Sequence, residues 1–123
     1  MSIESRLGEE QYCYLTTIGR VSGQPREIEI WFGARGDTIY MLSGGGMNAH
    51  WVMNILKNPH VSVRIDEETF SGTARLVEIG TPEESDARTL LATKYQGWHE
   101  GLPRSGWANT ALPVAVELAP AGE

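Results

Sequence analysis

The sequence predicts a mainly β fold, in which six antiparallel strands close into a small barrel with two or three helices beside it. Short segments rich in β-branched and aromatic residues recur along the chain, and turns rich in glycine separate them, with 14 glycines in all. Helical patterns do not alternate regularly with these strands, as a parallel sheet of βαβ units would require. Antiparallel strands of this number avoid exposed edges best by closing on themselves. With 123 residues, the chain is expected to form one domain over residues 1–123.

The six predicted strands are residues 11–18, 26–32, 38–43, 60–66, 70–79 and 112–118. The second strand shows the alternation most clearly, because Ile28, Ile30 and Phe32 share one face and the intervening residues share the other. Residues 34–37 are expected to form the turn before the third strand. The first three strands therefore form a meander.

The first predicted helix covers residues 49–58 and ends at Pro59, with Asn48 as its expected N-cap. Its polar arc holds His50, Asn54 and Lys57 at i, i+4 and i+7 spacing. The expected buried arc consists of Ala49, Val52, Met53 and Leu56, flanked by Trp51 and Ile55.

The second predicted helix begins with a capping box, in which Thr81 is the N-cap, Pro82 the first helical residue and Glu84 the third. Gly97 is expected to end this helix. Its predicted buried stripe consists of Ala87, Leu90, Leu91 and Tyr95.

The charge of the chain excludes a broadly basic nucleic-acid surface, because the net charge is −6 and the pI is near 5.0. The imbalance lies mainly in the second half. Residues 1–66 hold six Lys/Arg and seven Asp/Glu, whereas residues 67–123 hold four and nine. We therefore expect an anionic ligand to bind the first half.

Cysteine, histidine and hydropathy patterns narrow the class of protein further. Cys13 is the single cysteine, so no internal disulfide can form, and its apolar neighbours predict a buried small side chain. The three histidines lack metal-ligand spacing, so no metal site is expected. No apolar segment approaches the ~20 residues that span a bilayer, and the first ten residues do not form a signal peptide. We expect a cytoplasmic protein with no membrane or nucleic-acid partner.

The first candidate binding segment is residues 19–26, which join two predicted strands. They include Arg20, Ser22, Gly23 and Arg26 and contain no acidic residue. Such a hairpin can present backbone N–H groups and guanidinium groups to a phosphate or carboxylate. The alternative is a plain hairpin turn with solvated arginines.

The second candidate segment is residues 43–48, which contain three consecutive glycines and Asn48 before the first helix. Glycines allow a ligand to approach the backbone closely, and a helix N-terminus favours negative charge. The segment lacks the Gly-Lys-Ser/Thr of a Walker motif and follows no βαβ unit. A flexible loop is the alternative interpretation.

Four aromatic residues are expected to line a substrate pocket: Trp31, Tyr95, Trp98 and Trp107. They could equally form part of the core or a dimer contact. The chain has no nucleophile elbow of a serine hydrolase. A bound cofactor is therefore expected to carry out the reaction.

Two ordered motifs resemble the deazaflavin-dependent nitroreductase family of flavin/deazaflavin oxidoreductases. The first is residues 15–26, and the second comprises residues 43–46, 50–51 and 54–63. The resemblance covers residues 12–80 well and the C-terminal third loosely. It implies an FMN-binding-like split β-barrel, shared with pyridoxamine-phosphate-oxidase-like proteins, that binds the deazaflavin cofactor F420. Related branches bind FMN, FAD or haem.

The resemblance also implies roles for individual residues. Arg20 and Arg26 would hold the cofactor phosphate, with Ser22 and Gly23 beside them. The residues expected along the cofactor ring are Ser43, Gly44, Gly45, Gly46, His50, Trp51 and Asn54. Asn48, at the expected start of the helix, is a further expected cofactor-binding residue. Two positions differ from the common family pattern, because Val21 replaces a frequent lysine and Gly44 a frequent charged or aromatic residue.

The expected function is an F420-dependent oxidoreductase that transfers hydride to a small electrophilic acceptor, namely a nitro, quinone or enone compound. Ser43 and Tyr95 are the expected hydrogen-bond donors to that acceptor. The alternatives are an FMN-dependent reductase or oxidase on the same fold and a non-enzymatic flavin or haem carrier. We expect a homodimer, with a monomer as the alternative.

Overall fold

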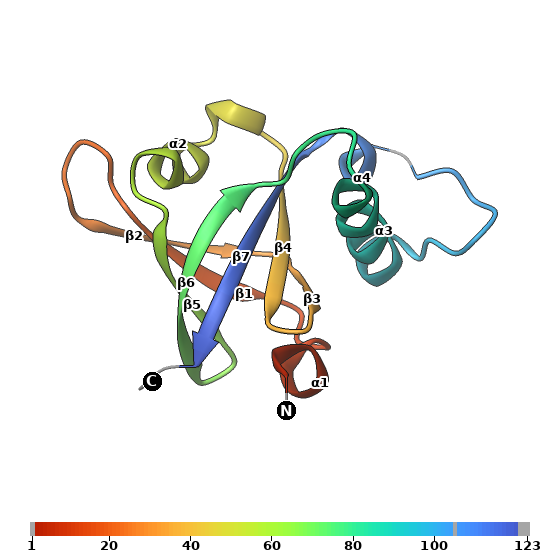
Figure 1. Cartoon of the computed structure of the whole chain (residues 1–123), viewed down its shortest axis with the longest axis horizontal. Helices are drawn as coiled ribbons and strands as arrows, with labels where there is room; N and C mark the ends of the chain where they lie inside the picture. Colours follow the sequence, from red (N-terminus) through yellow and green to blue (C-terminus); the bar gives the residue numbers. More distant parts are fainter. Residues whose placement is uncertain (1, 105, 121–123) are drawn as a thin grey trace.

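The fold is a curled, seven-stranded antiparallel sheet with helices outside it, as a computed structural model of residues 2–104 and 106–120 shows (Figure 1). The strand order is β2-β1-β5-β6-β7-β4-β3. The strands are β1 (Cys13–Ile18), β2 (Pro25–Ile30), β3 (Gly33–Arg35), β4 (Thr38–Ser43), β5 (His60–Ile65), β6 (Glu68–Leu76) and β7 (Leu112–Pro120). The helices are α1 (Ile3–Leu7), the 3₁₀ turn η1 (Gly46–Asn48), α2 (His50–Lys57), α3 (Pro82–Gln96) and α4 (Trp107–Thr110). The predicted mainly β, antiparallel class is confirmed.

The edges of the sheet differ from the sequence prediction. Residues 34–37 were expected to form a turn, but Gly33–Arg35 pair with β4 as a seventh strand, and the turn is confined to Gly36 and Asp37. Pairing with β4 decides this segment, because three residues are too few for a periodic pattern. β2 and β3 lie at opposite edges of the sheet and are not paired with each other. The strands were expected to close into a barrel, but the sheet forms a half-barrel because its two edge strands are not paired. Trp31 and Phe32 connect these two strands along the chain.

The second predicted helix is confirmed as α3. The Thr81 hydroxyl accepts a hydrogen bond from the Glu84 N–H (3.3 Å), and the Glu84 carboxylate accepts one from the Gly80 N–H (2.9 Å). Gly97 ends the helix in the left-handed region, with φ 66°. The capping box and the terminal glycine thus set both ends of α3, as the sequence predicted.

The start and orientation of the first predicted helix were wrong in two respects. Ala49, without a side-chain hydrogen bond, precedes α2, and Asn48 lies in the η1 turn instead of capping the helix. Leu56, expected in the buried arc, is 51% exposed, whereas Asn54 is buried. Asn54 turns inward because its amide group hydrogen-bonds to the β1 strand and to the loop that follows it.

Two apolar clusters support the sheet. The larger fills the curl between the strands and α2, and the smaller packs α3 and α4 against β4 and β7. Cys13 is fully buried in the larger cluster, and burial raises the pKa of its thiol to about 12. The prediction of a buried cysteine side chain is confirmed.

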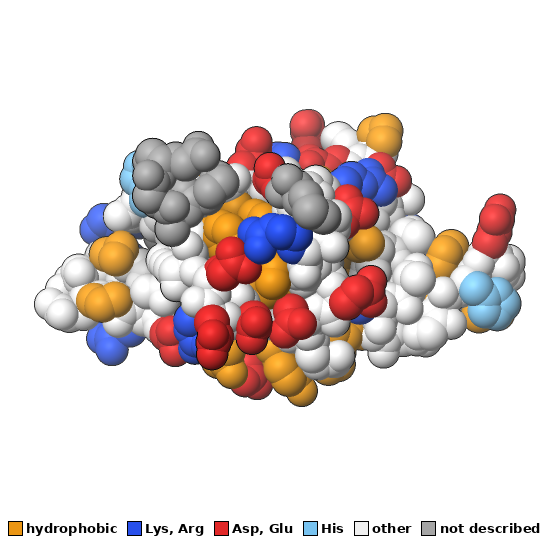
Figure 2. Space-filling model, turned by 90° about the horizontal axis from the view of Figure 1, so that it is seen from below, with side chains coloured by type: hydrophobic (Ala, Val, Ile, Leu, Met, Phe, Trp, Pro, Cys, Tyr) orange, Lys and Arg blue, Asp and Glu red, His pale blue; other side chains and the backbone are white. Residues whose placement is uncertain are grey.

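Acidic side chains spread over the face that carries α1 and the chain ends (Figure 2). α2 lies on the opposite side of the sheet from this face (Figure 1). No helix of the described residues is long and apolar enough to cross a membrane. These residues also contain no group of three metal-ligating side chains.

An ionic cluster that links α3 to the sheet predicts a pH-dependent stability. Arg75 on β6 forms two hydrogen bonds to Glu83 (2.7 and 2.8 Å), and Tyr40 donates another (2.8 Å). Mainly through Arg75, these contacts lower the pKa of Glu83 from 4.5 to about 2. Because the folded state lowers this pKa, its stabilising effect is complete above pH 4.5 and is lost as the pH falls through about 2.

We therefore expect the free energy of unfolding to decrease as the pH falls from 4.5 to about 2. Glu83→Gln should make the free energy of unfolding depend less steeply on pH in this range. Urea denaturation of both proteins between pH 2 and pH 6 measures the difference. Asp86→Asn is the matched control, since Asp86 forms an exposed ion pair on the same helix. Equal slopes for the wild type and Glu83→Gln would contradict this role for Glu83.

Candidate cofactor-binding site

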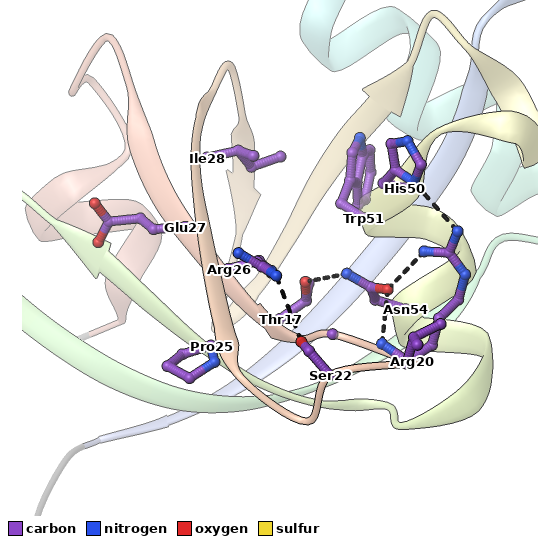
Figure 3. Close-up of a pocket in the computed structure, with 12 residues that line it drawn as sticks. Thr17, Arg20, Ser22, Pro25, Arg26, Glu27, Ile28, His50, Trp51 and Asn54 are labelled. Atoms are coloured by element: carbon purple, nitrogen blue, oxygen red, sulfur yellow. Dashed lines mark hydrogen bonds between the residues drawn. The ribbon is translucent and has the colours of Figure 1, made fainter.

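A cleft of about 700 Å³ lies between the β1–β2 hairpin and α2 (Figure 3). It brings together the first of the two motifs that resemble the deazaflavin family and the helical part of the second, which includes His50, Trp51 and Asn54. Its lining residues are Thr17, Gly19, Arg20, Val21, Ser22, Pro25, Arg26, Glu27, Ile28, His50, Trp51 and Asn54. Six of the predicted cofactor-binding residues are among them: Arg20, Ser22, Arg26, His50, Trp51 and Asn54.

The hairpin owes its shape to two glycines. The Gly19 and Gly23 N–H groups donate to the carbonyls of Gln24 and Gly19 respectively (2.8 Å each), and Gly23 has φ 73°. A β-carbon on Gly19 would lie 2.7 Å from the Ser22 hydroxyl oxygen and 3.6 Å from Arg26 Nε. Glycine at residue 19 therefore lets the Ser22 hydroxyl approach the backbone this closely, whereas the distance to Arg26 is an ordinary contact.

Arg20 is fixed by α2. The carbonyl oxygen of the Asn54 side chain accepts hydrogen bonds from the Arg20 backbone N–H (3.1 Å) and from its guanidinium Nη1 (3.0 Å). Arg20 Nη2 lies 3.2 Å from His50 Nδ1. Figure 3 shows the Asn54 and His50 side chains reaching Arg20 from the same helix. The predicted polar arc of the first helix thus faces the predicted anion-binding hairpin.

Two arginine side chains give this cleft positive charge, and no carboxylate of the described residues is paired with either of them. Within residues 2–104 and 106–120, neither Arg20 nor Arg26 takes part in an ion pair, and the Arg26 guanidinium lies 3.5 Å from the Ser22 hydroxyl. Glu27 is the acidic residue among the lining residues, and its side chain points away from the two arginines (Figure 3). Two guanidinium groups and a hydroxyl fit a phosphate group.

The other wall of the cleft is apolar. Ile28 on β2 and Trp51 on α2 are both partly exposed and pack against the main core. They lie above the arginine end in Figure 3. A planar ring joined to a phosphate group therefore fits this combination of surfaces.

The glycine-rich segment does not line the cleft. The Ser43 hydroxyl is buried and donates to the Gly46 carbonyl (3.0 Å), and Gly46 has φ 59°. Gly44, Gly45 and Asn48 are exposed. Gly23 lines a smaller hollow between the hairpin and the end of α2, beside Lys57 and Asn58. The binding roles of Gly23, Ser43, Gly44, Gly45, Gly46 and Asn48 stay predictions.

Three of the four predicted pocket aromatics form one cluster. The rings of Trp31 and Tyr95 stack with centroids 4.4 Å apart, and Trp107 meets Trp31 edge-on at 5.4 Å. Trp98 lies apart from them and donates its indole N–H to Leu102 (2.7 Å). A hollow of about 260 Å³ beside the cluster is lined by Tyr12, Glu29, Ile30, Trp31, Leu42 and Trp107.

The Tyr95 hydroxyl is engaged with the backbone. It accepts a hydrogen bond from the Phe32 N–H (3.1 Å) and lies within donating distance of the Gln11 and Phe32 carbonyls (2.8 and 2.9 Å). Burial raises its pKa to about 12. Tyr95 thus holds the chain at Trp31, and, like Ser43, it does not line the cleft. The catalytic roles expected for these two residues stay predictions.

Sequence reasoning missed several residues of the cleft, chiefly Thr17 and Ile28. Thr17 is buried and accepts a hydrogen bond from the Asn54 side-chain amide (3.0 Å). The alternation of β2 could have indicated Ile28, which shares a strand face with Arg26. No local pattern marks Thr17, because its partner is 37 residues away.

Comparison with known families decides the class of protein. The family described as F420H(2)-dependent quinone reductase matches residues 2–119. The chain belongs to this family. The resemblance seen in the sequence is confirmed, and the chain is an oxidoreductase of an F420-dependent family.

Solved structures with the same fold support the split-barrel architecture. An F420-H2 dependent reductase (FDR-A) has 23% identity and a TM-score of 0.66, over 89% of this chain and 94% of that one. A candidate pyridoxamine 5′-phosphate oxidase from Listeria innocua has 23% identity and a TM-score of 0.65, over 97% and 90%. A candidate 5-nitroimidazole antibiotic resistance protein from Bacteroides thetaiotaomicron has 16% identity and a TM-score of 0.74, over 94% and 77%.

Proposed function

We propose that the cleft binds F420 and that the protein transfers hydride from the reduced cofactor to a small quinone, nitro or enone acceptor. The observation that carries this proposal is the pair of arginines without carboxylate partners, Arg20 and Arg26, beside the apolar wall of Ile28 and Trp51. The phosphate would lie at the arginines, and the ring would lie along the apolar wall. Membership of an F420-dependent family supports the same cofactor.

The residues of the chain would supply binding, orientation and exclusion of water. Arg20 and Arg26 would balance the charge of the phosphate, with the Ser22 hydroxyl as a further donor. Ile28 and Trp51 would cover one side of the ring and keep water from it. Reduced F420 supplies a hydride when it is bound. Holding the two reactants in line can lower the barrier by about 7–11 kcal/mol in favourable cases.

The acceptor would bind beside the aromatic cluster. Ile30, the last residue of β2, and Trp31, which follows it, line the hollow next to Trp107. Aromatic rings favour a flat acceptor, and Glu29 disfavours an anionic one. We therefore propose a flat, uncharged acceptor.

A homodimer is the proposed assembly. Tyr12 and Trp31 are 43% and 39% exposed and lie next to the edge strand β2. A second copy could cover these aromatic side chains, which are large for an exposed surface.

Binding titrations with F420, FMN and haem, run side by side on the purified protein, test the cofactor assignment. We expect F420 to bind more tightly than FMN or haem, with a saturable change in its fluorescence, because the chain belongs to an F420-dependent family. Tighter binding of FMN would favour the alternative flavin enzyme. A saturable shift and sharpening of the haem Soret band on titration with the protein, with no F420 binding, would favour a carrier.

A further inference from the structure

We propose that Asn54 is a positioning residue, which holds the Arg20 guanidinium in the direction that an anion needs. This inference rests on the proposed function of the cleft. Asn54 is 3% exposed, and its single carbonyl oxygen accepts from both the backbone N–H and the guanidinium of Arg20 (3.1 and 3.0 Å). The Asn54 carbonyl oxygen thus fixes the direction of the Arg20 guanidinium relative to the Arg20 backbone.

The rest of the polar arc on α2 completes the arrangement. Lys57 Nζ donates to the Arg20 carbonyl (3.0 Å), and His50 Nδ1 lies 3.2 Å from Arg20 Nη2. Residues at i, i+4 and i+7 of one helix therefore contact the N–H, the carbonyl and the guanidinium of a single arginine. A free arginine side chain loses rotamer entropy when it binds an anion, and an arginine that is already ordered loses less.

Asn54 acts through Arg20 because its own polar atoms are occupied. Its carbonyl oxygen has two donors, and its amide nitrogen donates to the buried Thr17 hydroxyl (3.0 Å). An uncharged amide also orients the guanidinium without neutralising it. A carboxylate at the same place would form an ion pair with Arg20 and reduce its attraction for an anion.

A double-mutant cycle separates this role from simple support of the fold. F420 affinity is measured for the wild type, Asn54→Ala, Arg20→Ala and the double variant. Coupling energies between contacting residues reach 0.5–3 kcal/mol, about 2- to 150-fold. We expect Asn54→Ala to weaken F420 binding about tenfold when Arg20 is present and less than twofold when it is absent. The KM for reduced F420 should rise in parallel, with kcat at saturation unchanged.

The control is Ile65→Ala, which truncates a fully buried side chain at the end of β5. It should lower thermal stability and leave F420 affinity unchanged, since Ile65 does not line the cleft and β5 meets α2 at its other end. If Asn54→Ala does not fold, Asn54→Ser replaces it, because serine is too short to reach the Arg20 guanidinium. Equal losses of affinity in both Arg20 backgrounds would overturn the proposal.

The same double-mutant cycle, with inorganic phosphate as the ligand, distinguishes an error in the proposed cofactor from an error in the positioning role of Asn54. If the wild type does not bind F420 but Asn54 and Arg20 are coupled in phosphate binding, the proposed cofactor is wrong and the positioning role holds. If the wild type binds F420 and the two residues are not coupled, the positioning role is wrong and the proposed function holds. If neither ligand shows coupling, the role of Asn54 is limited to the fold.

Discussion

Arg20→Ala is expected to weaken F420 binding by about 10- to 150-fold, the equivalent of losing a charge-assisted hydrogen bond of about 1.5–3 kcal/mol. Arg20 lines the cleft, and no carboxylate of the described residues forms an ion pair with it. Its guanidinium is therefore available to an anion. Fluorescence titration of F420 measures the change. Arg26→Ala should have a smaller effect, because among the described residues the Arg26 guanidinium has one long hydrogen bond, to Ser22 (3.5 Å), and none to α2.

The matched control for Arg20→Ala is Arg64→Ala, which removes the same charge at a distance from the cleft. Arg64 lies on β5, where its guanidinium stacks on the Tyr14 ring at 4.1 Å. F420 affinity should be unchanged in this variant. Identical titration curves for the wild type, Arg20→Ala and Arg26→Ala would contradict the phosphate assignment. Parallel losses in Arg20→Ala and Arg64→Ala would point to net charge as the cause.

Arg88→Met is expected to lower the free energy of unfolding by about 3–5 kcal/mol, because it breaks a buried ion pair from one side. Arg88 is 6% exposed and donates to the Glu84 carboxylate (2.8 Å) and to the carbonyls of Ala111 (2.7 Å) and Ala108 (3.3 Å). Methionine fills much of the volume but leaves these acceptors without their donor. Urea denaturation measures the loss.

The control for Arg88→Met is Arg35→Ala, which breaks the ion pair between Arg35 on β3 and Asp86 on α3, the helix that also carries Arg88. Both side chains of that pair are about half exposed, at 56% and 48%, so the expected loss is below about 1 kcal/mol. Similar losses in the two variants would show that burial does not strengthen the Arg88 contacts.

The sequence predicted those parts of the fold that depend on neighbouring residues. The ends of α3 follow from Thr81, Glu84 and Gly97, whose hydrogen bonds and backbone angle are local. The inward turn of Asn54 depends on partners 34 and 37 residues away, and the pairing of β3 depends on β4 across a two-residue turn. Patterns within one element do not contain either contact.

The candidate site divides in the same way. The hairpin around Arg20 and Arg26 was identified from its own composition, and the structure places it on the cleft. The glycine-rich segment has the composition of a ligand loop, but Ser43 hydrogen-bonds within the segment and lies outside the cleft lining. On α2, the sequence pattern placed Leu56 inward and Asn54 outward, whereas Leu56 is exposed and Asn54 is buried.

The short connection between β2 and β3 has a mechanical consequence. Lys94 and Tyr95, at the end of α3, both hydrogen-bond to the Phe32 carbonyl (2.9 Å each), and β2 ends two residues earlier. These hydrogen bonds thus connect β2, the strand that carries Ile28, to α3, which packs against β3 and β4 at the opposite edge of the sheet (Figure 1). Because Trp31 alone separates the end of β2 from Phe32, a displacement of the C-terminal end of α3 would also move β2 and the cleft wall at Ile28.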